Sequence, residues 1–227
     1  MKKVSIAIDG PSGSGKSTLA KMLSECLGFI YLDTGAIYRT VALYANRLET
    51  VTTDEAAVAA LLPHLPQINF NHEGGVQRVY LGDEDVSEAI RLPETSLHAS
   101  HVAAHRLVRE FLLGMQREFA KSHDVVMDGR DIGTVVLPDA SLKVFLTATK
   151  ERRAERRYAE LIARGVEVEF DQVLTDIRQR DQRDMERKVS PLRPAQDAEV
   201  LDTTDLDLQG SLTALQKLAK IRLGLGG

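Results

Sequence analysis

One cysteine, no tryptophan and an aromatic content of 5% mark what this 227-residue chain lacks. A single cysteine excludes an internal disulfide, and we interpret Cys26 as a small core residue because it lies on the apolar stripe of a predicted helix. So few aromatic side chains make broad stacking platforms for single-stranded nucleic acid unexpected. The net charge of −4 agrees, because general polyanion binders are usually basic. We therefore expect no nucleic-acid partner.

Long hydrophobic runs are also missing. No stretch approaches the roughly 18 apolar residues that a membrane span needs. The first residues lead directly into a predicted strand without a cleavable apolar segment, so we expect no secretory signal. These absences predict a cytoplasmic protein that does not bind membranes.

What the chain does contain is a phosphate-binding pattern near its start. The apolar run 4–9 predicts a buried parallel strand, and apolar residues at helical spacing follow the loop. Between them stands G-x-x-x-x-G-K-[ST], the P-loop pattern, in the residues Gly10-Pro11-Ser12-Gly13-Ser14-Gly15-Lys16-Ser17, which Thr18 follows. The alternative is a Gly/Ser-rich turn that binds nothing.

The chemistry of this loop is anion binding. Its glycines allow the backbone to turn amide groups inward, and the positive end of the next helix adds to their field. We expect residues 10–18 to bind ATP, with Lys16 reaching the β- and γ-phosphates and the Ser17 hydroxyl serving as a ligand of Mg²⁺.

Four further apolar runs predict buried strands, each followed at once by polar residues. They are residues 29–32, 125–127, 142–146 and 199–201. Strands that alternate with helices predict a parallel sheet, whose ligands bind at the carboxyl ends of the strands. Among the residues at those ends, Asp128 is placed to hold a Mg²⁺-bound water, and the less favoured alternative is that it caps a turn at the end of the strand.

Two segments break the alternation of strands and helices. Residues 66–86 alternate polar and apolar around Gly74-Gly75, which predicts an antiparallel hairpin with a third short strand at 84–86. Residues 150–190 form a charged helical stretch that Gly165 interrupts. Most of its charges fit a solvated helix pair.

Some charges of that stretch suggest a function. Val173, Ile177, Arg180, Asp184 and Arg187 share one predicted helix face, which begins apolar and then becomes charged, so it could line a polar cavity or simply emerge into solvent. The neighbouring arginines at 152, 153, 156 and 157 repel one another unless an anion arrives, as in a flap that closes on phosphates. A plain surface helix remains the alternative.

Histidines offer a weaker signal. The spacing of His98, His101 and His105 suggests a metal site, but it also fits an ordinary helix. Because no cysteine lies nearby and phosphoryl transfer needs no zinc, we favour the ordinary helix.

Five sequence blocks together carry a family resemblance. They are I-D-G-P-S-G-S-G-K-S (8–17), L-D-T-G-A-I-Y-R (32–39), G-D-E-D-V (82–86), D-G-R-D-I-G-T-V-V (128–136) and R-D-Q-R-D (180–184). With these blocks the chain resembles the bacterial cytidylate kinases, which are adenylate-kinase-like nucleoside monophosphate kinases, over residues 4–222. The second and fourth blocks are specific, whereas the P-loop alone is not.

The resemblance implies an α/β fold of the P-loop NTPase type, a three-layer sandwich around a five-stranded parallel sheet of order 2-3-1-4-5. A small antiparallel insert in the monophosphate-binding region and a helical lid complete it. We expect a single kinase domain over 1–227. Its parts are a core of about 1–62, 96–150 and 190–227, an insert of about 63–95, and a lid with flanking helices of about 151–189.

The resemblance also implies an activity, which is the transfer of a phosphoryl group from ATP to CMP or dCMP with Mg²⁺ as cofactor. UMP should be a poorer acceptor, and we expect a monomer. The implied catalytic residues are Lys16, Arg130, Arg153 and Arg157. The implied CMP-binding residues are Thr34, Tyr38, Arg39, Ser100, Arg109, Arg130, Asp131, Arg180, Asp184 and Arg187. Of these, Arg39 and Arg130 would bind the phosphate, Ser100, Arg109 and Asp131 the cytosine, and Arg180 and Asp184 the sugar.

The chemistry is plausible without the family name. Transfer between two polyanions needs positive groups rather than a base, since the acceptor phosphate is already nucleophilic. Another nucleotide or a small acid such as shikimate remains an alternative acceptor. A GTPase switch would need an N-K-x-D motif and a transporter-type ATPase an L-S-G-G-Q-like signature, and the sequence contains neither.

Overall fold

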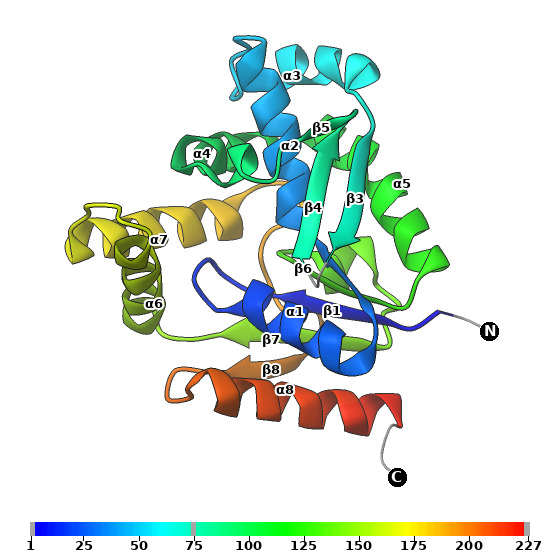
Figure 1. Cartoon of the computed structure of the whole chain (residues 1–227), viewed down its shortest axis with the longest axis vertical. Helices are drawn as coiled ribbons and strands as arrows, with labels where there is room; N and C mark the ends of the chain where they lie inside the picture. The colour runs from blue at the N-terminus through cyan, green and yellow to red at the C-terminus, as the bar shows by residue number, and fades with distance from the viewer. Residues whose placement is uncertain (1–2, 74–75, 225–227) are drawn as a thin grey trace. The chain divides into compact units, whose positions relative to one another are not determined.

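A computed structural model describes residues 3–73 and 76–224 of the chain. The chain divides into two compact units. The first comprises Met1–Tyr31 and His123–Gly227, and the second comprises Leu32–Ser122. Figure 1 labels most of the helices and strands of both units.

A five-stranded sheet of order β2-β6-β1-β7-β8 organises the first unit. β1 (Ser5–Asp9) pairs in parallel with β6 (Val125–Gly129) and with β7 (Leu142–Thr147), and β7 pairs in parallel with β8 (Glu199–Asp202). β2 (Ile30–Asp33) completes the sheet. The five predicted strands and their order 2-3-1-4-5 are confirmed.

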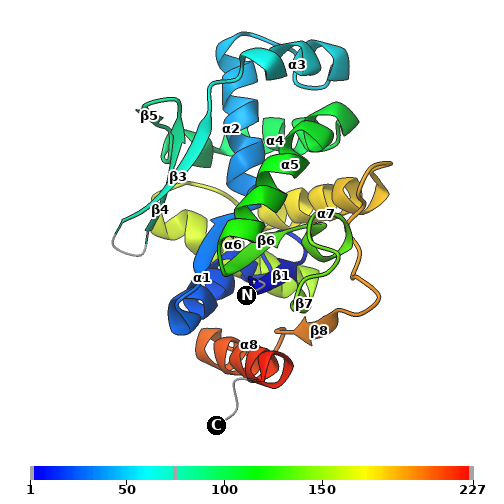
Figure 2. The same cartoon turned by 90° about the vertical axis from the view of Figure 1, so that its right-hand side faces the viewer.

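Two helices pack together on this sheet through apolar side chains. α1 (Lys16–Leu27) and α8 (Leu208–Leu223) share one core cluster with β1, β6 and β7 (Figures 1 and 2). Four of the six buried strand residues in this core are β-branched and the other two are leucines, which suits a sheet strand buried between neighbours. Register matters for the site, because Asp9 at the end of β1 lies opposite Gly129 and Phe145. The polar residues that follow these three strands therefore begin at the same edge of the sheet, where the strands have their carboxyl ends.

The charged stretch 150–190 forms two helices, as predicted. α6 (Lys150–Ala163) and α7 (Phe170–Glu186) pack through a small apolar core of their own. Gly165 stands between them at φ +74, a conformation that glycine adopts readily. One expectation is corrected: α7 ends at Glu186 and Arg187 has an extended ψ of 138, so Arg187 leaves the helix face that it was predicted to share.

The second unit joins helices to a small antiparallel sheet. β3 (Ile68–Glu73) pairs with β4 (Val76–Leu81), which pairs with β5 (Glu84–Asp85). The predicted hairpin and its third short strand are confirmed, while the Gly74-Gly75 turn lies outside the described residues. The helical elements are α2 (Thr34–Arg47), α3 (Glu55–Leu61), η1 (Leu62–His64), η2 (Ala89–Arg91), α4 (Pro93–Val102) and α5 (Arg106–Ser122).

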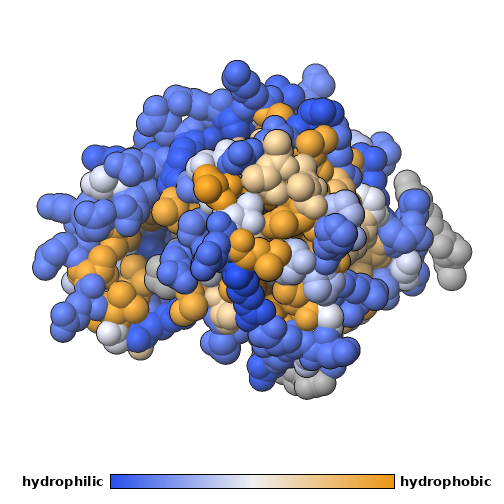
Figure 3. Space-filling view, turned by 90° about the horizontal axis from the view of Figure 1, so that it is seen from above, coloured by the Kyte–Doolittle hydropathy of each residue, from blue (hydrophilic) through white to orange (hydrophobic). Residues whose placement is uncertain are grey.

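The core of the second unit is built from α2, α4, α5 and the inner face of β3 and β4. On the face drawn in Figure 3, hydrophobic residues form separate groups among hydrophilic ones. No helix within residues 3–73 and 76–224 combines the length and the apolar character that crossing a membrane requires.

Candidate functional site

The P-loop pattern forms a tight turn at the start of α1. Gly13 and Gly15 have φ values of +73 and +85, and Gly15 is the N-cap residue of the helix. A Cβ on Gly10 would lie 2.1 Å from the carbonyl oxygen of Leu146, so the loop needs glycine here for space. This geometry turns the loop amides and the helix N-terminus into an anion site.

Lys16 is buried beside this loop. Its side chain donates to the carbonyl oxygen of Pro11 at 3.2 Å, and the residue is 7% exposed. Burial, and then the positive charge of Arg130, lower the pKa of Lys16 to about 7. The negative charge of a polyphosphate beside Lys16 would raise this pKa and favour the protonated ammonium.

Ser17 and Asp128 lie side by side although 111 positions separate them in the sequence. Ser17 Oγ donates to Asp128 Oδ2 at 2.7 Å, and the hydroxyl of Tyr31 donates to Asp128 Oδ1 at 2.8 Å. A hydroxyl and a carboxylate are the hard oxygen donors that Mg²⁺ prefers, and the helix dipole places negative phosphate oxygens nearby. The donor set therefore fits a magnesium ion bound together with a nucleotide.

Asp9 links the end of β1 to the segment that follows β6. Its carboxylate accepts hydrogen bonds from the amides of Ile132 at 2.8 Å and Gly133 at 2.7 Å. Burial raises the pKa of Asp9 to about 7, and the two amide hydrogen bonds oppose this rise only in part. These contacts hold a short π-helix, η3 (Ile132–Val136), in place directly after Arg130 and Asp131.

Arg130, Asp131, Asp184 and Arg187 form a buried charged cluster in the first unit. Arg130 Nε lies 2.7 Å from Asp184 Oδ2, and Arg187 Nη2 lies 3.6 Å from Asp131 Oδ1. Burial alone would raise the pKa of Asp184, but the neighbouring guanidiniums of Arg130, Arg180 and Arg187 hold it below its usual value. With Arg180 included, the structure thus brings together five residues that were predicted from separate motifs, three of them positive and two negative.

The arginines of α6 have partners in the structure, contrary to the expectation that they repel one another until an anion arrives. Arg153 is 3% exposed and forms an ion pair with Asp181 at 2.6 Å. Arg156 donates to Thr203 O at 2.7 Å. Arg152 and Arg157 pair with carboxylates of their own helix at 2.8 Å and lie closer to the surface. The unforeseen partners are acidic side chains and carbonyl groups that spacing alone does not reveal.

In the second unit, Arg39 is held at the start of α2. Asp33 is the N-cap residue, since its Oδ1 accepts from the amide of Ala36, and its Oδ2 lies 2.6 Å from Arg39 Nη2. Arg39 Nε is buried and has no hydrogen-bond partner among the described residues. A buried donor of this kind fits an anion that would complete its hydrogen bonding.

The other predicted residues of this unit lie on α2, α4 and α5. The guanidinium of Arg109 stacks over the ring of Tyr38 at 5.3 Å from its centroid and donates to Ala103 O at 3.0 Å. Ser100 Oγ is buried without a hydrogen-bond partner in the described part of the chain, and Thr34 is 3% exposed. Ser100 and Arg109 thus hold hydrogen-bonding groups that a ligand could use.

His98 and His101 lie on α4, whereas His105 lies between α4 and α5, and the three histidines surround a threonine. Thr52 Oγ1 lies 2.7 Å from His98 Nδ1 and 3.1 Å from His101 Nδ1, and His105 Nε2 lies 2.9 Å from Thr52 O. Within the described ranges, no group of three or more His, Cys, Asp or Glu residues could hold a metal ion. These histidines therefore tie the loop after α2 to α4 and α5.

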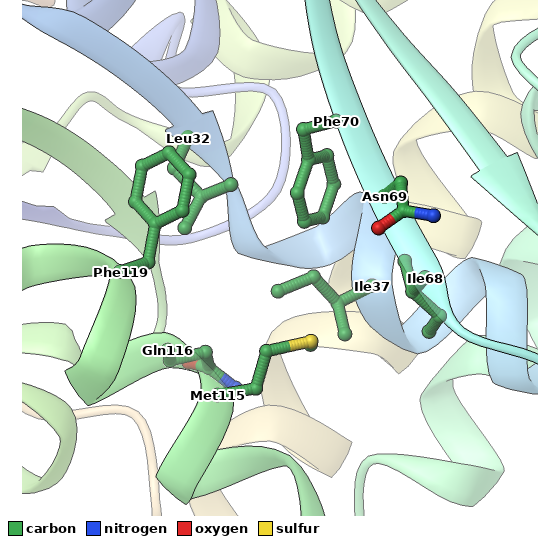
Figure 4. A pocket seen from close by; sticks show the side chains of 8 residues that line it. All are labelled: Leu32, Ile37, Ile68, Asn69, Phe70, Met115, Gln116 and Phe119. Carbon is green, nitrogen blue, oxygen red and sulfur yellow. The ribbon is translucent and has the colours of Figure 1, made fainter. Parts of the chain in front are cut away.

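The second unit also contains a cavity of about 210 Å³ (Figure 4). Leu32, Ile37, Phe70, Met115 and Phe119 give it apolar walls, with Ile68, Asn69 and Gln116 completing the lining. None of the predicted site residues lines it. An apolar cavity suits neither a phosphate nor a sugar, so we do not identify it with the nucleotide site.

Four residues of these sites were not singled out by sequence reasoning: Asp9, Tyr31, Asp33 and Asp181. Asp33 and Asp181 lie inside or beside the family blocks, and each pairs with an arginine that was singled out. Buried arginines need carboxylates, and that requirement could have pointed to both.

Comparisons with known proteins agree on one family. The family model described as cytidylate kinase matches residues 6–220. A cytidylate kinase of Caldicellulosiruptor bescii is 48% identical over 221 residues, covering 97% of this chain and 96% of that protein. One of Streptococcus mutans is 47% identical over 222 residues, covering 97% of both. A solved structure of an uncharacterized protein from Eubacterium ventriosum has a TM-score of 0.50 at 14% identity, covers 95% of this chain and 97% of that one, and supports the fold alone.

Proposed function

Because the chain belongs to the cytidylate kinase family, we propose that it transfers the γ-phosphoryl group of ATP to CMP or dCMP, forming ADP and CDP or dCDP. The observation that supports this best is the electrostatic environment of Lys16. Its ammonium lies at an anion-binding loop and feels the positive charges of Arg130 and Arg180 as well as the negative charges of Asp128 and Asp184, so with Lys16 itself the positive groups outnumber the negative ones. Such a surplus of fixed positive charge suits a reaction that joins two polyanions.

The loop 10–18 binds the phosphates of ATP in this proposal. Its amides and the N-terminus of α1 meet the phosphate oxygens, and Lys16 contacts the β- and γ-phosphates. Mg²⁺ bound with ATP would be held by Ser17 Oγ and, through water, by Asp128, and would supply further neutralising charge. Tyr31 orients the Asp128 carboxylate through its hydroxyl.

The acceptor needs no general base, because the phosphate of CMP is already a nucleophile. We assign the binding of the CMP phosphate to Arg39 and Arg130. Thr34 and Tyr38, which are close to Arg39 in the sequence, are assigned to the same CMP-binding set. The buried, unpartnered Nε of Arg39 supports this assignment. Asp184 orients Arg130 by their ion pair.

Cytosine recognition requires donors toward O2 and N3 and an acceptor for the 4-amino group. We assign the donors to Arg109 and the acceptors to Asp131 and Ser100. Uracil would place a carbonyl group against the acceptor and leave buried groups unpaired, so UMP should be the poorer substrate. Arg180 and Asp184 bind the sugar, and Arg187 holds Asp131 in place.

The helices of residues 151–189 act as a lid, and residues 63–95 act as the monophosphate-binding insert. Closing a lid excludes water that would otherwise accept the phosphoryl group. Arg157 is the lid arginine that we assign to the transferred phosphate, because its pair with Glu160 is partly exposed and weak enough to exchange. The protein acts as a monomer in the cytoplasm in this proposal.

An acceptor panel tests the function directly. ADP release from ATP is measured with CMP, dCMP, UMP, AMP and shikimate, and Lys16→Met serves as the inactive control. We expect turnover with CMP and dCMP, weaker turnover with UMP and none with shikimate. Faster turnover with AMP or shikimate than with CMP would refute the assignment.

A further inference from the structure

Two arginines of α6 hold the phosphate-binding loop from its outer side. Arg153 Nη1 donates to Ser12 O at 2.9 Å, and Arg156 Nη1 donates to Ser14 O at 3.2 Å. In a trans peptide unit the C=O and N–H groups point in opposite directions. Fixing these two carbonyls outward therefore turns the amides of Gly13 and Gly15 toward the inside of the loop.

The contact between helix and loop is close. A Cβ on Gly13 would lie 2.9 Å from the carbonyl oxygen of Arg153, and a Cβ on Gly15 would lie 3.9 Å from Arg156 Nη1. Both glycines also have positive φ values, which L side chains rarely adopt. Gly13 thus lets α6 approach the loop backbone, and both glycines let the loop backbone turn.

Asp181 of α7 fixes the first of these arginines. Its Oδ1 lies 3.0 Å from Arg153 Nη1 and its Oδ2 lies 2.6 Å from Arg153 Nη2, while Arg153 Nε donates to Ala148 O at 3.0 Å. The two side chains are 4% and 3% exposed. A buried guanidinium without a carboxylate would be costly, so Asp181 is what keeps Arg153 beside the loop.

We propose that Asp181 and Arg153 are positioning residues for phosphate binding, which preset the amides of Gly13 and Gly15 before ATP arrives. Arg153 then acts through the loop, in place of the direct phosphate contact that the resemblance implied. A charged donor on a carbonyl also polarises its peptide unit, which strengthens the amide as a donor. Preset donors need no reorganisation when the phosphates bind. The inference rests on the proposed function for the identity of the ligand, a nucleoside triphosphate.

The test compares Asp181→Asn with Asp176→Asn, which changes an exposed carboxylate of the same helix that accepts a hydrogen bond from Gln172 Nε2 at 2.8 Å. Calorimetry gives the dissociation constants for ATP, for CMP and for inorganic tripolyphosphate, which carries no adenosine. Competition by ATP shows that tripolyphosphate occupies the loop. For Asp181→Asn we expect ATP and tripolyphosphate to bind about tenfold more weakly and CMP to bind unchanged. The amide resonances of Gly13 and Gly15 should shift in the same variant, and Asp176→Asn should match the unaltered protein.

A merely structural ion pair would give another result. Asp181→Asn would then lower the melting temperature while the three dissociation constants stayed equal to those of the unaltered protein, or rose together, and either outcome overturns the proposal. Should Asp181→Asn fail to fold, Arg156→Ala decides, because it leaves the buried pair intact and removes the side-chain donor to Ser14 O. Unchanged tripolyphosphate binding by that variant would overturn the proposal too. Turnover of CMP by the unaltered protein is recorded in parallel, so a failure of the proposed function shows itself separately.

Discussion

Arg130 and Asp184 form an ion pair of 2.7 Å between the end of β6 and the last turns of α7. Their side chains are 17% and 10% exposed, so the charges compensate each other in a largely desolvated place. The pair connects the strand edge that carries the phosphate-binding loop with the helices proposed as the lid.

Replacing Asp184 by Asn should therefore affect both stability and activity. The buried guanidinium of Arg130 loses its carboxylate, which costs about 3 kcal/mol of unfolding free energy. Arg130 also loses its orientation, so kcat/KM for CMP should fall by about 100-fold. Urea denaturation and steady-state kinetics measure the two effects. The matched control is Glu186→Gln, an exposed carboxylate two residues on, which should change neither; equal effects of both substitutions would contradict the assigned role.

Asp9 predicts an unusual dependence of stability on pH. Its pKa is about 7 in the folded chain and near 3.8 when unfolded. Between these two pH values the folded state therefore binds one proton more than the unfolded state. The contribution of this proton to the free energy of unfolding is full below pH 3.8 and is lost as the pH rises through about 7. In Asp9→Asn the contribution is absent. The difference in unfolding free energy between the two proteins should fall by up to about 1.4 kcal/mol per pH unit from pH 4 to 7. If the free energies of unfolding of the two proteins changed in parallel with pH, Asp9 would not retain its proton in the folded state.

Lys16 predicts proton uptake when ATP binds. Because its pKa is lowered to about 7, the Lys16 side chain is largely in the neutral amine form at pH 8 in the free protein. The phosphates favour the charged form, so binding should take up about one proton. Calorimetric titration with ATP in two buffers of different ionisation enthalpy counts the protons. Lys16→Arg should abolish the uptake, because a guanidinium stays protonated, and Lys21→Arg on the same helix should retain it. No uptake by the unaltered protein would contradict the account of Lys16.

Asp131 predicts base selectivity. In Asp131→Asn the carboxylate acceptor becomes an amide that can also donate, so the site should discriminate less against a carbonyl at the 4-position. We expect the ratio of kcat/KM for CMP over UMP to fall by about tenfold or more. Steady-state kinetics with both nucleotides measures the ratio. A variant in which both values fell equally would show that Asp131 does not recognise the base.

Sequence patterns predicted the sheet well, because β-branched runs bounded by polar residues have few other interpretations. The strand order and the small antiparallel sheet are confirmed, and the order came from the family resemblance rather than from the runs themselves. Helix ends were less predictable: Arg187 fits the periodicity of α7, yet the chain leaves the helix one residue earlier. Its contacts with Ser190 O and Asp131 hold it there, and such tertiary partners are invisible to spacing.

The partners of the charged residues were the least predictable part of the site. Four neighbouring arginines on α6 suggested mutual repulsion, whereas Arg153 is compensated by Asp181, 28 positions away. Likewise Tyr31 approaches Asp128 across 97 positions. Neither contact follows from local sequence, because each depends on how helices and strands pack.

A structure with a bisubstrate analogue, in which adenosine and cytidine are joined by a chain of phosphates, tests the central claim most directly. The account predicts that Lys16, Arg39 and Arg130 all contact that single phosphate chain, with the cytosine near Arg109 and Asp131. An analogue whose phosphates left Arg39 and Arg130 in separate solvent-filled sites, without contact to the chain, would contradict it.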